Sequence, residues 1–426
     1  MISKWLHALA CRLHRPSPAR TTIAREIRLD LELLECKRLL VMYHDTGVAQ
    51  LMSRYYADQQ LSRAEVISLL QSTADNGGLE VNELRDIRTM CANAAMPNHV
   101  RSLTKNLLDS PANAAVSRID LNRLSDQALP ASTVMRLIDK WFYGKERPLI
   151  PSTAEYRSVA GQLFVGGASR NDVDQGKLGN CWLMASLAAV ADKFNSNIRE
   201  MFIDNQDSTF TVRFYRFTGR TYVEDYVTVD RFLPVAKTTG RAVFAEFGRQ
   251  ASDSKNELWV ALAEKAYAQW NQSGFAQRGS GKDGQNDYAA LAGGSARVAL
   301  GQITGSAATR SAMSTTSAQF VIQALAEGAA VIVSRYMNAA GTSRHAYVIT
   351  GFERGEFLLQ NPWGHSHLRM NWQQMESECY RFAILRKASA RSASKLPGAM
   401  AKVSPMPGVV QDHRPEFSGA RLSTVA

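Results

Sequence analysis

Residues 175–186 read QGKLGNCWLMAS, and this stretch decides how the rest of the chain is interpreted. Gly176 and Gly179 predict a tight loop, because glycine adopts backbone conformations that other residues resist. Asn180 is a good N-cap residue, so Cys181 is expected in the first turn of an apolar helix. The positive end of a helix stabilises a thiolate, which is the form that a nucleophilic cysteine needs. Taken alone, the pattern also fits an inert buried cysteine, which is the commonest fate of this residue.

A second stretch supplies a candidate base. Residues 345–352 and 356–361 read HAYVITGF and EFLLQN, and they predict two strands joined by a turn at residues 353–355. In such a hairpin His345 and Asn361 are directly opposite, with Cβ atoms about 5 Å apart. The Asn361 carbonyl would then accept from one imidazole nitrogen and leave the other facing the thiol. The alternative is a pair of ordinary polar residues at the ends of a hairpin.

Two further residues complete the candidate site. Charge that develops on the substrate oxygen in the transition state needs hydrogen-bond donors. The backbone N–H of Cys181 and the side-chain amide of Gln175 are the candidates. Trp363 follows Asn361 closely and is expected to shield the bond between His345 and Asn361 from water.

Together these stretches resemble the calpain family of papain-like cysteine proteases. The chain order of cysteine, histidine and asparagine is the papain-type order. The resemblance covers about residues 165–385 and rests on separate blocks in the family's order, at residues 175–182, 229–235, 257–268, 345–347 and 361–364. It implies an α+β papain-like core of two lobes, a helical lobe with the cysteine and a β-rich lobe with the histidine and asparagine. It also implies these roles: Gln175 as oxyanion donor, Cys181 as nucleophile, His345 as base and Asn361 as the residue that orients the base.

The chain departs from the family in two ways. Asn180 stands where the family has aspartate, and both residues cap helices. One family calcium site is matched in part, since Val165 and Gly167 offer carbonyls and Asp172 a carboxylate, but its acidic partner near Ala276 is missing. The second lobe lacks the acidic residues of the other calcium site. Calcium needs several oxygen ligands, so no metal ligand or cofactor is assigned, and calcium is left open.

Composition shifts divide the chain into five parts. We expect a disordered basic leader at 1–24, an all-helical domain at 25–150, the lobe with the nucleophile at 151–282, the lobe with histidine and asparagine at 283–386, and a disordered basic tail at 387–426. In the helical domain, Ser62 and Glu65 form a capping box. Residues 72–83 have an EF-hand-like end but lack acidic residues at the first positions, so a plain helix–turn–helix is favoured. Partner binding by this domain stays open.

Composition, net charge and cysteine content limit the classes of protein to which this chain can belong. The 426 residues carry a net charge of +11, with 45% hydrophobic and 21% charged residues. No nucleic-acid-binding motif is found. The five scattered cysteines indicate neither a disulfide framework nor a zinc site. No apolar run is long enough for a transmembrane helix. The N-terminus lacks the features of a signal peptide, so we expect a protein that is cytoplasmic or exported without one.

The sequence therefore predicts a cysteine-type endopeptidase that acts on protein substrates through an acyl-enzyme on Cys181. Two alternatives remain. One is a catalytically silent protease fold that serves as a binding module. The other is a thiol acyltransferase such as a transglutaminase, because it uses the same nucleophilic chemistry.

Overall fold

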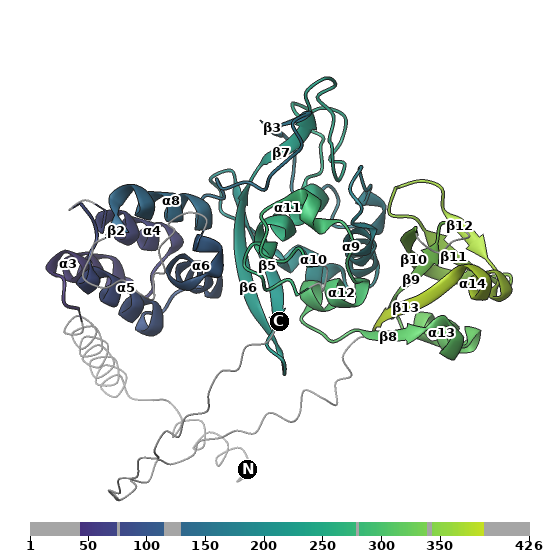
Figure 1. The fold of residues 1–426 in the computed structure, drawn as a ribbon. Helices are drawn as coiled ribbons and strands as arrows, with labels where there is room; N and C mark the ends of the chain where they lie inside the picture. The colour runs from purple at the N-terminus through teal and green to yellow at the C-terminus, as the bar shows by residue number, and fades with distance from the viewer. Residues whose placement is uncertain (1–42, 75–76, 115–128, 278–280, 339–342, 387–426) are drawn as a thin grey trace, which may run out of the picture. The chain divides into compact units, whose positions relative to one another are not determined.

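The computed structural model describes residues 43–74, 77–114, 129–277, 281–338 and 343–386. The predicted basic leader, the first part of the helical domain and the tail after residue 386 lie outside these ranges. The described part mixes helices with antiparallel sheets, which makes it an α+β protein (Figure 1). Within it, no helix is both long and apolar enough to cross a membrane.

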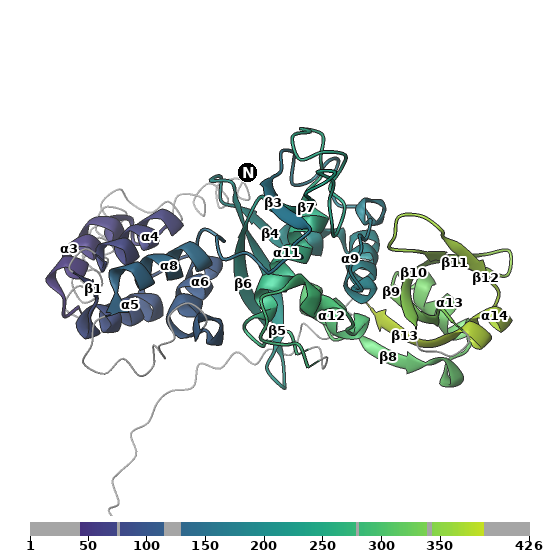
Figure 2. The ribbon, with the colours of Figure 1, turned by 45° about the horizontal axis from the view of Figure 1, so that its top comes forward.

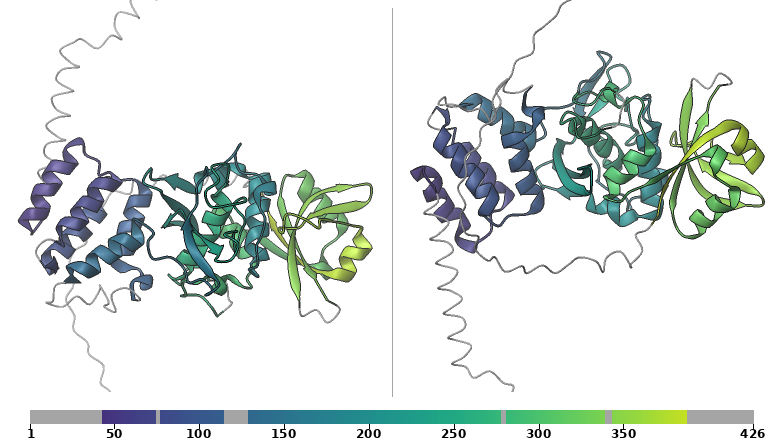
Figure 3. Two further views of the ribbon diagram at one scale, coloured as in Figure 1. Left: turned by 90° about the horizontal axis from the view of Figure 1, so that it is seen from above. Right: turned by 60° about the horizontal axis from the view of Figure 1, so that its bottom comes forward.

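The first described segment is mostly helical. Its helices and 3-10 turns are α3 (Thr46–Tyr55), η1 (Tyr56–Asp58), α4 (Arg63–Ser72), α5 (Val81–Asn93), α6 (Asn98–Asp109), η2 (Pro111–Asn113) and α8 (Ala131–Trp141). They enclose their own hydrophobic cluster, which Tyr226 joins from the next segment. Figure 3 shows the helices of this first segment side by side. The predicted capping box is present, because the Ser62 hydroxyl accepts from the backbone of Glu65 while the Glu65 carboxylate accepts from the backbone of Ser62.

The expectation of an all-helical segment is incomplete. Strands β1 (Gly78–Leu79) and β2 (Leu129–Pro130) form a short antiparallel pair. A side chain at Gly78 would collide with the carbonyl of Leu129, which explains the glycine at that position. Glu83, the last residue of the EF-hand-like stretch, accepts a hydrogen bond from the backbone of Glu80 and so caps α5.

The middle segment combines a helical layer with small sheets. Its helices and turns are η4 (Arg170–Asp172), α9 (Cys181–Lys193), α10 (Asn195–Glu200), α11 (Trp259–Asn271), η5 (Tyr288–Leu291) and α12 (Ala296–Thr304). Its strands are β3 (Ala154–Ser158), β4 (Phe202–Asp204), β5 (Thr209–Phe217), β6 (Tyr222–Asp230) and β7 (Phe232–Ala236). They pair as two sheets, β4-β5-β6 and β3-β7. Helix α9 is buried along nearly its whole length, as its continuous apolar sequence predicts.

The last segment is built on one six-stranded antiparallel sheet. Its strand order is β12-β11-β10-β9-β13-β8. The strands are β8 (Thr309–Ala312), β9 (Ala330–Tyr336), β10 (Arg344–Glu353), β11 (Glu356–Gln360), β12 (Leu368–Met370) and β13 (Cys379–Leu385). The turn η6 (Met313–Thr315) and the helices α13 (Ala318–Ala326) and α14 (Trp372–Glu378) pack with this sheet in a separate hydrophobic cluster (Figure 2).

Helix α9 joins the two segments that carry the candidate site. It packs against β9 and β10. One face of the six-stranded sheet belongs to the cluster with α13 and α14, and the other face contributes Ala346 and Val348 to the core around α9. The turn η5 and helix α12 follow residue 283, yet they also belong to the core around α9. The boundary expected at residues 282–283 therefore does not coincide with the end of the core around α9, which continues through α12 and also includes residues of β9, β10 and β13.

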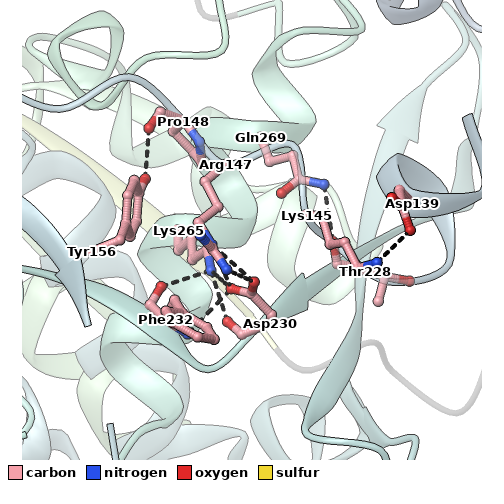
Figure 4. Close-up of polar contacts among 10 residues, drawn as sticks. All are labelled: Asp139, Lys145, Arg147, Pro148, Tyr156, Thr228, Asp230, Phe232, Lys265 and Gln269. Carbon is pink, nitrogen blue, oxygen red and sulfur yellow. Dashed lines mark hydrogen bonds and ion pairs between the residues drawn. The ribbon is translucent and has the colours of Figure 1, made fainter. Parts of the chain in front are cut away.

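A buried ion cluster anchors α11 to the chain that leads out of α8 (Figure 4). The Lys265 ammonium, which is fully buried, donates to the carbonyls of Asp230 at 2.7 Å and Phe232 at 2.8 Å and pairs with the Asp230 carboxylate. The Arg147 guanidinium donates to the same carboxylate at 2.6 and 2.8 Å. Burial lowers the pKa of Lys265 to about 8, against the opposing effect of Asp230. The cluster therefore depends on a single carboxylate that compensates two cations.

Candidate active site

Cys181 is the first residue of α9, at the end of the loop that the glycines predict. At Gly176 a Cβ atom would lie 2.1 Å from the carbonyl oxygen of Phe244, so only glycine fits there. Asn180 occupies the N-cap position, but its side chain makes no capping hydrogen bond. The predicted side-chain cap is therefore wrong, although the predicted start of the helix at Cys181 agrees with the structure.

The side chain of Asn180 has another partner. Its amide Nδ2 donates to the Glu264 carboxylate of α11 at 2.7 Å, and the backbone N–H of Ala245 donates to the other Glu264 oxygen at 2.9 Å. All of this lies in the interior, and burial raises the pKa of Glu264 to about 7. Glu264 thus holds the residue immediately before Cys181, a role that the sequence analysis did not assign. The only signal was an acidic residue inside a helix that is mostly apolar.

The environment of the Cys181 thiol differs from the one expected. Burial raises its pKa, while the backbone N–H groups of Ala346, Trp182 and Cys181 itself act in the opposite direction. Desolvation outweighs the helix N-terminus here, so the resting thiol is neutral near pH 7. Contact with the amide of Ala346 also places the sulfur against the strand that carries His345.

His345 lies on β10 and contacts Asn361, although the predicted register is wrong. The turn contains only Arg354 and Gly355, both with positive φ, and β10 has a bulge between Ile349 and Gly351. Gln360 pairs with Val348, so one further step along β11 would bring Asn361 opposite position 347 rather than 345. A shift of two residues preserves the face of the strand, and diagonal neighbours remain within reach of each other.

The hydrogen bond between these residues sets the state of the imidazole. His345 Nε2 lies 2.8 Å from Asn361 Oδ1. An amide oxygen can only accept, so Nε2 carries the proton and Nδ1 keeps its lone pair. The backbone N–H of Trp363 also donates to Asn361 Oδ1, at 3.0 Å, and the backbone N–H of Asn361 donates to His367 Nδ1 at 3.1 Å. His367 therefore helps to fix Asn361.

Aromatic rings enclose the imidazole. The Trp363 ring centroid lies 4.3 Å from that of His345, and the Tyr347 ring meets it edge to face at 5.0 Å. Burial lowers the pKa of His345, the hydrogen bond that it donates to Asn361 raises it, and the Arg335 charge lowers it. The imidazole is therefore neutral near pH 7, with Nδ1 available as a base.

Cys181 and His345 line one cavity of about 290 Å³. The other contributors come from α9, α12 and the strands β8, β9, β10 and β13. Its lining residues are Gly179, Trp182, Gly293, Gly294, Ser295, Ala296, Arg297, Arg310, Ser334, Arg344, Ala346, Tyr380, Arg381, Phe382 and Ala383. The structure therefore brings the candidate nucleophile and the candidate base, distant in sequence, to the same opening.

Gln175 is not among the residues that line this cavity. Its backbone N–H donates to the carbonyl of Pro362 at 2.7 Å, which connects the loop before Cys181 to the chain after Asn361. Its side-chain Nε2 donates to the carbonyl of Leu178, and its Oε1 has no hydrogen-bond partner among the described residues. The role of Gln175 as oxyanion donor stays a prediction.

The candidate calcium loop has an acidic neighbour that the sequence analysis missed. The Glu257 carboxylate accepts from the backbone N–H of Val165 at 2.7 Å, and burial and the nearby charge of Asp172 raise its pKa. Asp172 Oδ2 accepts from Trp259 Nε1 at 2.9 Å. The acidic residue beside this loop is therefore Glu257, just before α11, rather than one near Ala276. Two mutually repelling carboxylates beside an exposed loop fit a hard cation, although no group of three or more His, Cys, Asp or Glu gathers anywhere in the described ranges.

Comparison with known proteins points to one family. The profile of calpain family cysteine proteases matches residues 152–395, which is more than half of the chain. Calpain-8 of Mus musculus is 31% identical over 243 residues, 51% of this chain and 31% of calpain-8. Calpain-9 of Mus musculus is 29% identical over 279 residues, 59% of this chain and 36% of calpain-9. A calpain of Schistosoma mansoni is 31% identical over 232 residues, 48% of this chain and 28% of that protein.

The chain spans about a third of the length of these curated relatives. The matched range contains all four candidate residues, Gln175, Cys181, His345 and Asn361. The residues before 152 fall outside the matched range. On the match over residues 152–395, this chain belongs to the calpain family of cysteine proteases.

Proposed function

We propose that this chain is a calpain-like cysteine endopeptidase that hydrolyses peptide bonds in protein substrates through an acyl-enzyme on Cys181. The main support is that Cys181 and His345 line one cavity while Asn361 leaves Nδ1 of the imidazole as the basic nitrogen. The arrangement matches what a thiol nucleophile with an oriented base requires.

In this proposal Nδ1 of His345 takes the proton of the Cys181 thiol as the sulfur attacks the substrate carbonyl carbon. The backbone N–H of Cys181 and the side-chain amide of Gln175 donate to the oxygen that becomes negative. His345 returns the proton to the leaving amine, which becomes the new N-terminus of the released product. A water molecule then attacks the thioester carbonyl while His345 takes its proton; the carbon–sulfur bond breaks, the acid leaves, and the sulfur of Cys181 regains the proton from His345.

We also propose that the core works as two lobes. The hydrophobic cluster around α9 and α11 would form the lobe with Cys181, and the cluster within the six-stranded sheet the lobe with His345 and Asn361. Trp363 would keep water from the hydrogen bond that orients the imidazole, because its ring covers that of His345.

Labelling and cleavage test the proposal together. The native protein and Cys181→Ala are incubated with casein and with an epoxide thiol inhibitor, with and without calcium. We expect casein cleavage and labelling of Cys181 in the native protein, and neither in Cys181→Ala. Cys379→Ala is the matched control, because Cys379 is a buried thiol in the six-stranded sheet and should be dispensable.

Two other outcomes separate the alternatives. Absence of both labelling and cleavage under every condition would leave a silent binding module as the better account. Incorporation of a primary amine into casein without cleavage would favour an acyltransferase, because the same acyl-enzyme would then be captured by an amine instead of water.

Calcium belongs to the proposal as a regulator of position rather than of chemistry. The carboxylates of Asp172 and Glu257 and the carbonyls of Val165 and Gly167 would hold it, since these are the oxygen ligands that calcium prefers. When bound it would supply charge that offsets the repulsion between the two carboxylates. This loop precedes Gln175 in the chain, so a bound ion would act on the loop that leads to Cys181 through the residues between them.

A further inference from the structure

The cavity at Cys181 is lined by four arginines, from four different elements. Arg297 lies in the first turn of α12, Arg310 on β8, Arg344 on β10 and Arg381 on β13. All four are exposed. No aspartate or glutamate is among the described residues that line this cavity. Four cations converging on a small opening create a local positive potential that favours an anionic occupant.

Two of these guanidinium groups are held in place by one ring. The Arg344 guanidinium lies 5.1 Å from the centroid of the Tyr380 ring, and the Arg381 guanidinium lies 5.4 Å from it. Arg344 also lies 5.9 Å from the centroid of the Tyr336 ring. Stacking on aromatic faces keeps guanidinium groups ordered without neutralising them. The donors of Arg381 are therefore pre-organised for a carboxylate, which arginine binds with paired hydrogen bonds.

The place of the cavity identifies which part of a substrate enters it. It reaches Cys181 and His345 but neither Gln175 nor Trp363, so it occupies one side of the reacting pair. A peptide bond at Cys181 would therefore present a neighbouring side chain, on one side of the bond, to the arginines. Ser295 and Ala296 also line the cavity, so the positive N-terminal end of α12 faces the same space.

We propose that this cavity selects substrates with an aspartate or glutamate side chain close to the scissile bond. The inference rests on the proposed function, because it takes Cys181 as the residue that attacks the peptide. Binding of the carboxylate would align the scissile carbonyl with the sulfur. Arg310 and Arg381 are specificity-determining residues in this account, and they take no part in the transfer of protons.

Peptide pairs test the selection directly. Fluorogenic peptides capped at both ends, so that no terminal carboxylate is present, carry glutamate or glutamine at each position around the scissile bond. We expect kcat/KM to be higher for glutamate by about tenfold or more at a position on one side of the bond. The preference should shrink as salt is raised, because the charges are exposed. Equal cleavage of the two members at every position would overturn the inference and leave the proposed function intact.

A charge reversal provides the second arm. The double variant Arg310→Glu/Arg381→Glu should lose the preference or favour glutamine, while still hydrolysing neutral peptides. Arg220→Glu, in the exposed turn between β5 and β6 and away from the cavity, is the control and should keep the native preference. A preference that survives in the double variant, or that disappears equally in the control, would contradict the assignment.

A binding measurement distinguishes failure of the proposed function from failure of the proposed carboxylate site. If no peptide is hydrolysed and Cys181 is not labelled, the same fluorescent peptides are titrated against Cys181→Ala and followed by anisotropy. Tighter binding of the glutamate peptide to Cys181→Ala would support the carboxylate site without catalysis, provided that the difference disappears when Arg310→Glu/Arg381→Glu are introduced into the same variant. Equal binding of the glutamate and glutamine peptides would overturn it.

Discussion

Nε2 of His345 donates to the side-chain oxygen of Asn361 at 2.8 Å, and the rings of Trp363 and Tyr347 pack against the imidazole. The same oxygen accepts from the backbone of Trp363. This bond fixes both the orientation of the imidazole and the nitrogen that carries its proton. The chemistry proposed for Cys181 depends on it, because the other nitrogen, Nδ1, must be the base.

Replacing Asn361 should damage catalysis more than folding. Asn361→Ala removes the acceptor, so the imidazole can rotate or change tautomer, and we expect kcat/KM for casein-derived peptides to fall by about tenfold or more. Asn82→Ala, on the exposed surface of α5, is the control and should retain native activity. Native activity in Asn361→Ala would contradict the orienting role.

The acid limb of the pH profile should lie low. Burial lowers the pKa of His345 below its ordinary value of 6.5, while Asn361 raises it and Arg335 lowers it. Activity requires neutral imidazole, so kcat/KM should be retained as the pH falls to 6.5 and be lost below it. Asn361→Ala should move the limb further down, because it removes the interaction that favours the protonated ring. A limb above pH 6.5 in the native protein would contradict this account.

Glu264 should make stability depend on pH. Burial raises its pKa from 4.5 to about 7 in the folded state. A carboxyl group whose folded pKa is raised contributes stability below the unfolded value, and the contribution is lost as the pH rises through the folded value. The native protein should therefore lose roughly 3 kcal/mol relative to Glu264→Gln between pH 4.5 and 7, measured by urea unfolding.

The control for that comparison is an exposed carboxylate. Glu200→Gln removes a side chain that is 66% exposed and should leave the pH dependence unchanged. A constant difference in stability between the native protein and Glu264→Gln across this pH range would show that Glu264 keeps an ordinary pKa when folded.

Removing the carboxylate of the ion cluster in Figure 4 should strongly lower the free energy of unfolding. Asp230→Asn leaves the fully buried ammonium of Lys265 and the partly exposed guanidinium of Arg147 without their shared carboxylate, so we expect a loss of about 3–5 kcal/mol in unfolding free energy. The control is Asp139→Asn, which breaks the exposed pair with Lys145 and should cost at most about 1 kcal/mol. Similar losses in the two variants would contradict the importance of burial.

Calcium dependence should follow Glu257. If Asp172 and Glu257 hold the ion, calcium should raise the melting temperature of the native protein, and Glu257→Gln should weaken this effect because one carboxylate is lost. Glu353→Gln, which alters an exposed residue at the turn between β10 and β11, should respond as the native protein does. An equal thermal shift in Glu257→Gln would exclude this loop as the site.

Local signals in the sequence predicted much of the arrangement. The glycine loop and the start of α9 at Cys181, the capping box of Ser62 and Glu65, and the hairpin of β10 and β11 all depend on residues close together in the chain. They are predictable because steric limits and capping act within a few residues. The predicted hairpin already paired His345 with Asn361, and the family resemblance then assigned them the roles of base and orienting residue beside Cys181.

Contacts between distant elements came only from the tertiary structure. Asn180 and Glu264 are 84 residues apart, and Val165 and Glu257 are 92 apart, so nothing local indicates either pair. The hairpin register could not be predicted either, because one bulge and a two-residue turn moved Asn361 by two positions.

The pKa of the Cys181 thiol and the gathering of arginines beside it also depend on the tertiary structure. The sequence determined that Cys181 begins a helix, and from that alone a lowered thiol pKa follows. The fold buries the sulfur, and desolvation then raises its pKa despite the nearby amides. Likewise, Arg297, Arg310, Arg344 and Arg381 are scattered in the chain, and only the packing of α12 beside the six-stranded sheet gathers them at Cys181.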